Sequence, residues 1–131
     1  ILASGPLLLK DGRVCDWSLC GKDFVQNRCV IPVTGFCEWD GDRTGWDFLP
    51  QEEEMLYLAG VCRKKAEGWE ATVVTEHASG CVGEIHHRTP LILSGENLRQ
   101  WLYDEGQARQ FLEEAKERVL LKRKKMEGET L

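Results

Sequence analysis

The sequence predicts an α+β fold in a single domain, and two patterns indicate this class. Strand-like segments rich in Val, Thr and aromatic residues fill most of the first two thirds of the 131-residue chain. Helical periodicity follows mainly after residue 94. Strands that come first and helices that come later are typical of α+β proteins. A chain of this length forms one domain that buries a substantial core.

The N-terminal part predicts a hairpin followed by two further strands. Asp11-Gly12 lies between residues 6–9 and 13–17 and suits the type I′ turn of a hairpin. Residues 29–33 and 36–39 are short apolar runs with a Thr-Gly step between them. We therefore expect a strand in each of these runs.

The middle of the chain predicts a loop, two longer strands and a short helix. Residues 40–45 form a loop by their Asp, Gly and Thr content. We expect strands over residues 55–62 and 69–75, joined by a polar turn at residues 64–68. Apolar spacing predicts a short helix over residues 76–84.

The C-terminal part predicts one more strand and two helices. The strand covers residues 90–93, and Ser94 is placed to cap a helix over residues 96–103. A second helix is predicted from residue 107 to about residue 125, and we expect a flexible tail over residues 122–131. The apolar stripe of this second helix consists of Ala108, Phe111, Leu112, Ala115 and Val119.

Composition and charge restrict the classes of function. The net charge of −5 argues against general electrostatic attraction to DNA, so a DNA site needs a local basic groove. Basic residues crowd residues 118–125, whereas acids crowd residues 52–54. The chain has no apolar run long enough to span a bilayer and no export signal, so we expect a cytoplasmic protein.

The six cysteines predict neither a zinc site nor a disulfide framework. The chain has no C-x-x-C pair of the kind that zinc sites use. Disulfides need an oxidising compartment. We expect Cys29, Cys37, Cys62 and Cys81 to be small buried residues on strands or strand ends.

Two short segments carry the candidate chemistry. Glu38 lies in the apolar aromatic run 35–39, where an acid needs a partner or a chemical role. His86 lies in residues 85–90, just before a proline and an apolar strand. A carboxylate and an imidazole brought together form a general acid/base pair. The alternatives are an exposed strand acid or a structural ion pair for Glu38, and a strand-end cap for His86.

These motifs resemble, in their order, those of the SOS-response-associated peptidase (SRAP) family. The similarity begins at residues 27–32 and continues into Gly35-Phe36-Cys37-Glu38-Trp39. It resumes at residues 57–60 and 72–75. Ile85-His86-His87-Arg88-Thr89-Pro90 follows, and then Trp101-Leu102. The resemblance implies a mainly antiparallel, strongly curved, barrel-like sheet with flanking helices and a C-terminal helix.

The resemblance also implies a reaction and a partner. Members of the family bind single-stranded DNA and capture abasic sites covalently through a cysteine at the mature N-terminus, which forms a thiazolidine. The same cysteine is exposed by self-removal of the initiator Met. By this similarity Glu38 and His86 are the catalytic acid/base residues, and no metal or organic cofactor is expected. We expect a monomer with no membrane association.

Three further residues are candidates for DNA contact. Trp39 and Trp17 could stack on unpaired bases, although large aromatics beside strands are more often core residues. Arg88 could contact a phosphate, and a structural ion pair is the alternative that its position favours.

Departures from the family pattern keep other interpretations open. The chain begins with Ile1 and shows neither the N-terminal cysteine nor the asparagine-and-arginine element, so we expect an SRAP-like domain, residues 1–131, that is N-terminally incomplete. Without the cysteine it would be inactive in covalent capture. One alternative is a degenerate, non-catalytic module that binds nucleic acid or protein. Another is a thiol hydrolase that uses Cys37 or Cys15 with His86, although Cys37 and its neighbour Glu38 point to opposite faces of a strand.

Overall fold

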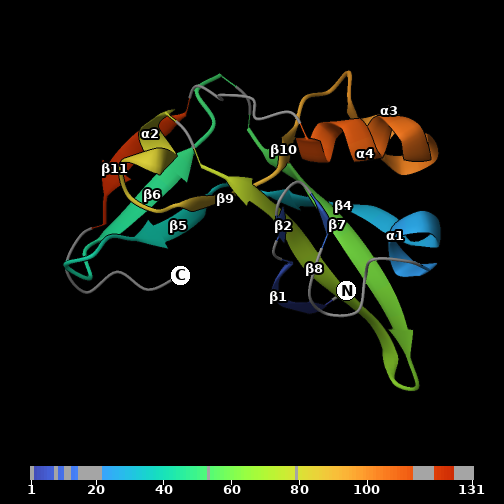
Figure 1. The fold of residues 1–131 in the computed structure, drawn as a ribbon. Helices are drawn as coiled ribbons and strands as arrows, with labels where there is room; N and C mark the ends of the chain where they lie inside the picture. The colour runs from blue at the N-terminus through green and yellow to red at the C-terminus, as the bar shows by residue number, and fades with distance from the viewer. Residues whose placement is uncertain are drawn as a thin grey trace.

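A curled, mainly antiparallel sheet organises the fold, and the computed structural model describes residues 2–7, 9–10, 13–14, 22–52, 54–78, 80–113 and 120–125. Within these residues the sheet has six strands, and only β1 runs parallel to its neighbour, β8 (Figure 1). These strands are β1 (Leu2–Leu7), β4 (Arg28–Val33), β7 (Leu56–Lys65), β8 (Gly68–His77), β9 (Arg88–Pro90) and β10 (Ile92–Leu93).

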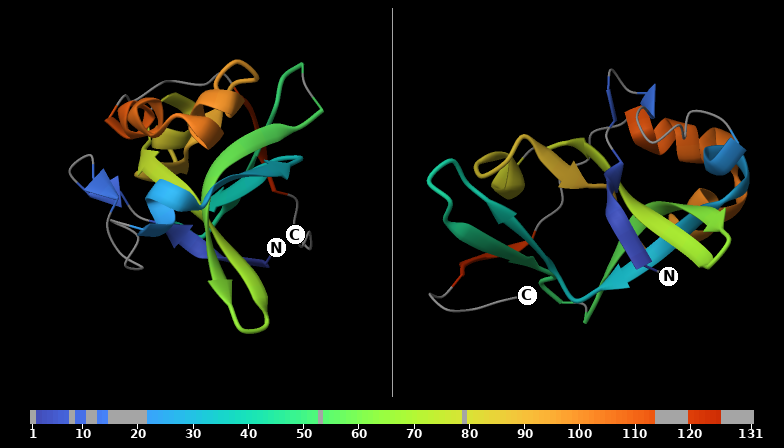
Figure 2. Two further views of the ribbon diagram at one scale, coloured as in Figure 1. Left: turned by 90° about the vertical axis from the view of Figure 1, so that its right-hand side faces the viewer. Right: turned by 90° about the horizontal axis from the view of Figure 1, so that it is seen from below.

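Strands β7 and β8 separate at one end, and this divergence curls the sheet. They pair from Lys65↔Gly68 up to Gly60↔Val73. Beyond that point Leu91 lies between them: it donates its N–H to the Val74 carbonyl oxygen, and its own carbonyl oxygen accepts the N–H of Ala59. Strand β9 therefore continues along β8, and β10 continues along β7. At the other end the β7–β8 hairpin projects beyond the rest of the molecule (Figures 1 and 2).

A second, smaller sheet lies at one side of the first. Its strand order is β11-β6-β5, with all neighbours antiparallel. The strands are β5 (Phe36–Trp39), β6 (Gly45–Leu49) and β11 (Leu121–Lys124). The short strands β2 (Leu9–Lys10) and β3 (Arg13–Val14) form a separate hairpin.

Three helices cover one face of the large sheet, and the small sheet packs against its other face. The first hydrophobic core lies between the large sheet and α1 (Lys22–Gln26), α3 (Leu98–Tyr103) and α4 (Glu105–Glu113). Trp101 and Phe24 are its largest fully buried side chains. The second core joins the large sheet, the small sheet and α2 (Gly80–Gly83), with Phe48, Leu58 and Val82 among its members. The predicted α+β class with a curved, mainly antiparallel sheet is confirmed.

Most predicted strands are present, with shifted ends. The hairpin around Asp11-Gly12 is confirmed in part: Leu9 pairs with Val14, but Pro6 and Leu7 belong to β1, which pairs with β8. The strands expected at residues 29–33, 36–39, 55–62, 69–75 and 90–93 correspond to β4, β5, β7, β8 and β9–β10. The polar turn is shorter than predicted, because strand pairing continues to Lys65↔Gly68. Gly68 has a φ of 135°, which glycine adopts with little strain.

Several predicted helix boundaries are wrong. Residues 76 and 77 belong to β8, so the helix expected over 76–84 is reduced to α2. The helix expected from residue 96 begins at Leu98, and Asn97 rather than Ser94 is its N-cap residue. Among the described residues, α4 ends at Glu113.

The C-terminal prediction is wrong in a different way. Residues 121–124 form β11, although we expected a helix to about residue 125 and a tail from residue 122. The last described element is therefore a strand and not a helix. Pairing with β6 decides its conformation, since Arg123 lies opposite Asp47 and donates to that carboxylate at 2.9 Å. Ala115, Val119 and residues 126–131 lie outside the described residues.

Candidate active site

Glu38 lies on the inner face of the small sheet because side chains alternate along β5. Phe36 and Glu38 share a face, and their partners across the strand pair are Phe48 and Trp46. The rings of Phe36 and Phe48 stack with centroids 5.2 Å apart. The aromatic surroundings desolvate the carboxyl, and this burial raises the pKa of Glu38, while the nearby His86 partly offsets the rise.

Asp40 fixes the hairpin that brings Trp46 opposite Glu38. One of its carboxylate oxygens accepts the backbone N–H groups of Asp42 and Thr44, each at 2.9 Å. The other accepts the indole N–H of Trp46 at 3.0 Å. This last hydrogen bond is the main reason why the pKa of Asp40 is lowered. The loop expected over residues 40–45 is thus confirmed for residues 40–44, and Gly45 already belongs to β6. Hydrogen bonds to Asp40 order this loop.

His86 is held by the backbone on both of its sides. Its N–H donates to the carbonyl oxygen of the buried Val82 in α2 at 2.9 Å. Its ring nitrogen Nδ1 accepts the N–H of Arg88 at 3.1 Å and lies 3.2 Å from the Arg88 carbonyl oxygen. The two contacts require different states of Nδ1. Without a proton Nδ1 accepts the Arg88 N–H, and with a proton it donates to the Arg88 carbonyl oxygen.

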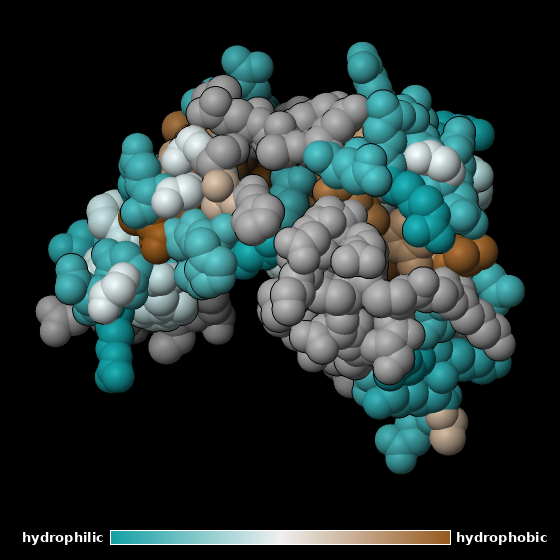
Figure 3. Space-filling model, viewed as in Figure 1, coloured by the Kyte–Doolittle hydropathy of each residue, from teal (hydrophilic) through white to brown (hydrophobic). Residues whose placement is uncertain are grey.

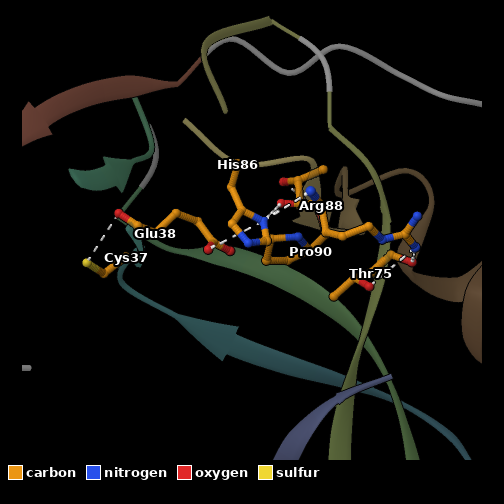
Figure 4. Close-up of polar contacts among 7 residues, drawn as sticks. Cys37, Glu38, Thr75, His86, Arg88 and Pro90 are labelled. Atoms are coloured by element: carbon orange, nitrogen blue, oxygen red, sulfur yellow. Dashed lines mark hydrogen bonds and ion pairs between the residues drawn. The ribbon is translucent and has the colours of Figure 1, made fainter. Parts of the chain in front are cut away.

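The structure brings Glu38 and His86 together, as the sequence predicted. Glu38 Oε2 lies 3.9 Å from His86 Nδ1, and Figure 4 shows the carboxylate turned toward the ring. One water or a small closing movement bridges such a gap, and apo sites often have loose acid/base contacts of this kind. The two side chains are 23% and 35% exposed, so a substrate can reach both. On the face drawn in Figure 3, hydrophilic residues cover most of the left-hand part of the molecule, which contains the small sheet.

Arg88 points away from this pair. Its guanidinium donates to the Thr75 carbonyl oxygen at 2.8 Å and contacts Thr75 Oγ1 at 3.4 Å (Figure 4). The residue is only 8% exposed and fixes β9 to β8. Its burial favours the structural interpretation over contact with a phosphate.

Trp39 follows Glu38 in the chain but lies on the opposite face of the small sheet. It pairs across the strands with Gly45, where an added Cβ would lie 2.8 Å from the Trp39 ring. The indole thus lies over a glycine, and the residue is still 52% exposed. The structure does not bring it to the Glu38–His86 pair. Trp17 lies outside the described residues.

Cys37 also lies on the face opposite to Glu38, across from Asp47. Burial raises the pKa of its thiol, although the ammonium of Lys125 partly counteracts this. A thiol that resists ionisation and points away from the histidine is a poor nucleophile for it. The hydrolase alternative based on Cys37 and His86 therefore has no support, and Cys15 lies outside the described residues.

The expectation of buried cysteines on strands holds fully only for Cys62, because Cys29, Cys37 and Cys81 are half-buried. Cys29 and Cys62 lie on the paired strands β4 and β7, and Cys62 is buried. Burial and the neighbouring Cys62 strongly raise the pKa of the Cys29 thiol. Cys81, expected on a strand, lies in α2.

The described residues contain neither a membrane-spanning helix nor a cluster of metal ligands. None of the helices in the described part of the chain is long and apolar enough to cross a membrane. In the same residues, no three His, Cys, Asp or Glu side chains gather as a metal site requires.

Most of the sequence matches a known protein family. The model of the SOS response associated peptidase (SRAP) family matches residues 16–127, which is most of the chain. The chain belongs to the SRAP family. The signature segments that contain Glu38 and His86 lie inside this match.

Named relatives of this SRAP chain are abasic site processing proteins. One is YoqW of Bacillus subtilis, 29% identical over 90 residues that cover 62% of this chain and 40% of that protein. Another is HMCES of Gallus gallus, 34% identical over 103 residues that cover 57% of this chain and 31% of that protein. The chain thus spans less than half the length of either relative.

Solved structures share the fold. A crystal structure of a protein from Bordetella bronchiseptica aligns with a TM-score of 0.67 at 21% identity, covering 79% of this chain and 57% of that one. One from Bacteroides thetaiotaomicron aligns with a TM-score of 0.60 at 21% identity, covering 69% and 45%.

Two residues of the site were not anticipated from the sequence. Trp46 borders Glu38 on the same sheet face, and the signal for its strand was the alternation of Trp46 and Phe48 with Asp47. The turn residues just before it obscured this pattern. His87 stacks on His86, a contact between neighbours that no periodicity indicates.

Proposed function

We propose that this SRAP chain is part of a protein that processes abasic sites in single-stranded DNA by covalent capture. The observation that carries the proposal is the approach of Glu38 Oε2 to His86 Nδ1 at 3.9 Å, in a chain of this family. The names of the relatives support the substrate class. A mature N-terminal cysteine supplies the nucleophile.

The reaction needs proton transfers and no change of oxidation state. The amine of the cysteine adds to the aldehyde carbon of the ring-opened sugar, and loss of water gives an imine. The thiol then adds to the imine carbon, and the nitrogen takes up the thiol proton to give a thiazolidine. Each step requires a proton to move to or from a heavy atom of the reacting groups.

The two side chains suit these transfers. Because burial raises the pKa of Glu38, its carboxyl holds a proton more strongly than an exposed glutamate and donates it to the departing water. His86 exchanges a proton with the sugar oxygen when the ring opens. The same pair activates water in the self-removal of the initiator Met.

The test uses the full-length gene product and an oligonucleotide with a single abasic site. We expect a heat-stable band on a denaturing gel, and a rate of formation that falls by about a hundredfold or more for Glu38→Gln and for His86→Ala. Glu84→Gln is the matched control, because Glu84 is exposed and paired with Lys122. Parental rates in both variants would contradict the acid/base roles. Binding of DNA without any crosslink would favour the non-catalytic module.

A further inference from the structure

A second histidine lies flat against the first. The rings of His86 and His87 are stacked with centroids 4.6 Å apart and planes inclined by 25°. Consecutive side chains of an extended strand point to opposite faces, so this stack requires a turn at residues 86–87. The chain makes this turn between α2 and β9.

The backbone holds this turn in place on each side. His86 donates its N–H to Val82 O at 2.9 Å, and the His87 carbonyl oxygen accepts the N–H of Ala78 at 2.9 Å. The ring of His87 is solvent-exposed, yet its attachment point is fixed by these bonds. The fold therefore fixes the backbone from which the two stacked rings project.

The orientation of the His86 ring decides whether it faces Glu38. Nδ1 meets three groups: the Arg88 N–H at 3.1 Å, the Arg88 carbonyl oxygen at 3.2 Å and Glu38 Oε2 at 3.9 Å. Turning the ring over would replace Nδ1 by a carbon and lose all three contacts. Since the ring is 35% exposed, the rest of the protein does not enclose it completely.

We propose that His87 is a positioning residue: its ring covers one face of His86 and holds Nδ1 toward Glu38 and Arg88, which leaves Nε2 for the substrate. The part of this inference that concerns the crosslinking rate rests on the proposed function. Stacking of two rings is a contact that another aromatic side chain reproduces. Position 87 therefore requires an aromatic ring but not a histidine in particular.

The experiment compares His87→Ala with His87→Phe in the full-length gene product. For each variant, single-turnover crosslinking to the abasic oligonucleotide gives a limiting rate and a half-saturating concentration. We expect His87→Ala to lower the limiting rate by about two- to tenfold, the range that an aromatic contact accounts for. We expect an unchanged half-saturating concentration. His87→Phe should restore the rate.

A spectroscopic measurement tests the position of the ring without any activity. Long-range proton–nitrogen NMR spectra distinguish protonation at Nδ1 from protonation at Nε2 of His86. We expect one dominant form in the parent and in His87→Phe, and an averaged signal in His87→Ala. An unchanged His86 signal in His87→Ala, or a His87→Phe variant as slow as His87→Ala, would overturn the inference. If no crosslink forms at all, the proposed function fails, and the spectra still decide whether His87 positions His86.

Discussion

Trp101 donates its indole N–H to the carbonyl oxygen of Cys29 at 2.9 Å, although 72 residues separate the two in the chain. Arg28 completes this link, because its Nε donates to the Trp101 carbonyl oxygen at 2.6 Å. Helix α3 is thereby fixed to strand β4. Arg28 and Trp101 belong to the segments that resemble the SRAP family, and here they stabilise the fold rather than the site.

Replacing Trp101 should therefore destabilise the protein strongly. Trp101 is fully buried, so Trp101→Ala should lower the free energy of unfolding by about 3–5 kcal/mol. Trp101→Phe keeps most of the apolar contact and leaves the Cys29 carbonyl oxygen without its donor, at a cost of about 1–3 kcal/mol. Urea denaturation measures both. Trp69→Phe, at a residue 45% exposed, is the control and should change stability by less than about 0.5 kcal/mol.

Replacing Glu38 should stabilise the folded state at neutral pH. The pKa of Glu38 is raised in the folded protein, so the folded state holds this proton more strongly than the unfolded chain, whose reference pKa is 4.5. The cost of the buried carboxylate is absent below pH 4.5 and complete above the folded pKa. Glu38→Gln should have the higher Tm at pH 7–8, and the difference should shrink as the pH falls toward 4.5.

Glu84→Gln provides a control of opposite sign. The hydrogen bond from Lys122 lowers the pKa of Glu84, so this carboxylate contributes stability above pH 4.5 that is lost as the pH falls through its folded pKa. Glu84→Gln should therefore not raise the Tm at neutral pH. A Glu38→Gln variant with a lower Tm than the parent at pH 8 would show that the Glu38 carboxylate is stabilised, not strained, in the fold.

Arg88 should prove to be a structural residue. Arg88→Ala removes the guanidinium hydrogen bonds to Thr75, and it should lower the free energy of unfolding by at least about 1.5–3 kcal/mol. Arg88→Lys should lose part of this energy too, since one ammonium does not reproduce the fork of donors. Arg99→Ala, at an exposed position, serves as the control. A stable Arg88→Ala variant with weakened DNA binding would instead favour the phosphate contact.

Trp39 and Gly45 should be coupled energetically. Gly45→Ala places a Cβ 2.8 Å from the Trp39 ring and 3.0 Å from Lys125 Cδ, and it should cost about 1–3 kcal/mol. In a Trp39→Ala background the cost should be smaller, because the indole is absent. A double-mutant cycle by urea denaturation gives the coupling energy. Additive effects would mean that the indole does not occupy this position in solution.

The parts of the fold that follow a local pattern were predictable from the sequence. Strands β4 and β5 follow from short apolar runs bounded by turn residues, and Asp11-Gly12 indicated the first hairpin. The approach of Glu38 to His86 followed from the order of the motifs, not from local propensity. Which face of β5 carries the acid followed from strand alternation.

The parts that depend on distant partners were not predictable. Residues 121–124 are Leu, Lys, Arg and Lys, which favour a helix when considered alone. They form a strand because two residues of β6 bind them. Asp47 accepts a hydrogen bond from Arg123, and the ring of Trp46 lies 4.9 Å from the ammonium of Lys122. Similarly, the parallel pairing of β1 with β8 has no local signal. Tertiary contacts outweigh propensity at both places.

The order of strands in the small sheet has a consequence for how the protein folds. Strand β11 pairs with β6, and Arg123 reaches Asp47 across 76 residues of chain. During synthesis, β5 and β6 leave the ribosome long before the strand that completes their sheet. Closing so large a loop is entropically costly and slows folding of such non-local pairings. The side of the molecule that carries Glu38 is thus expected to be the last to reach its native arrangement, only after residues 121–124 have emerged.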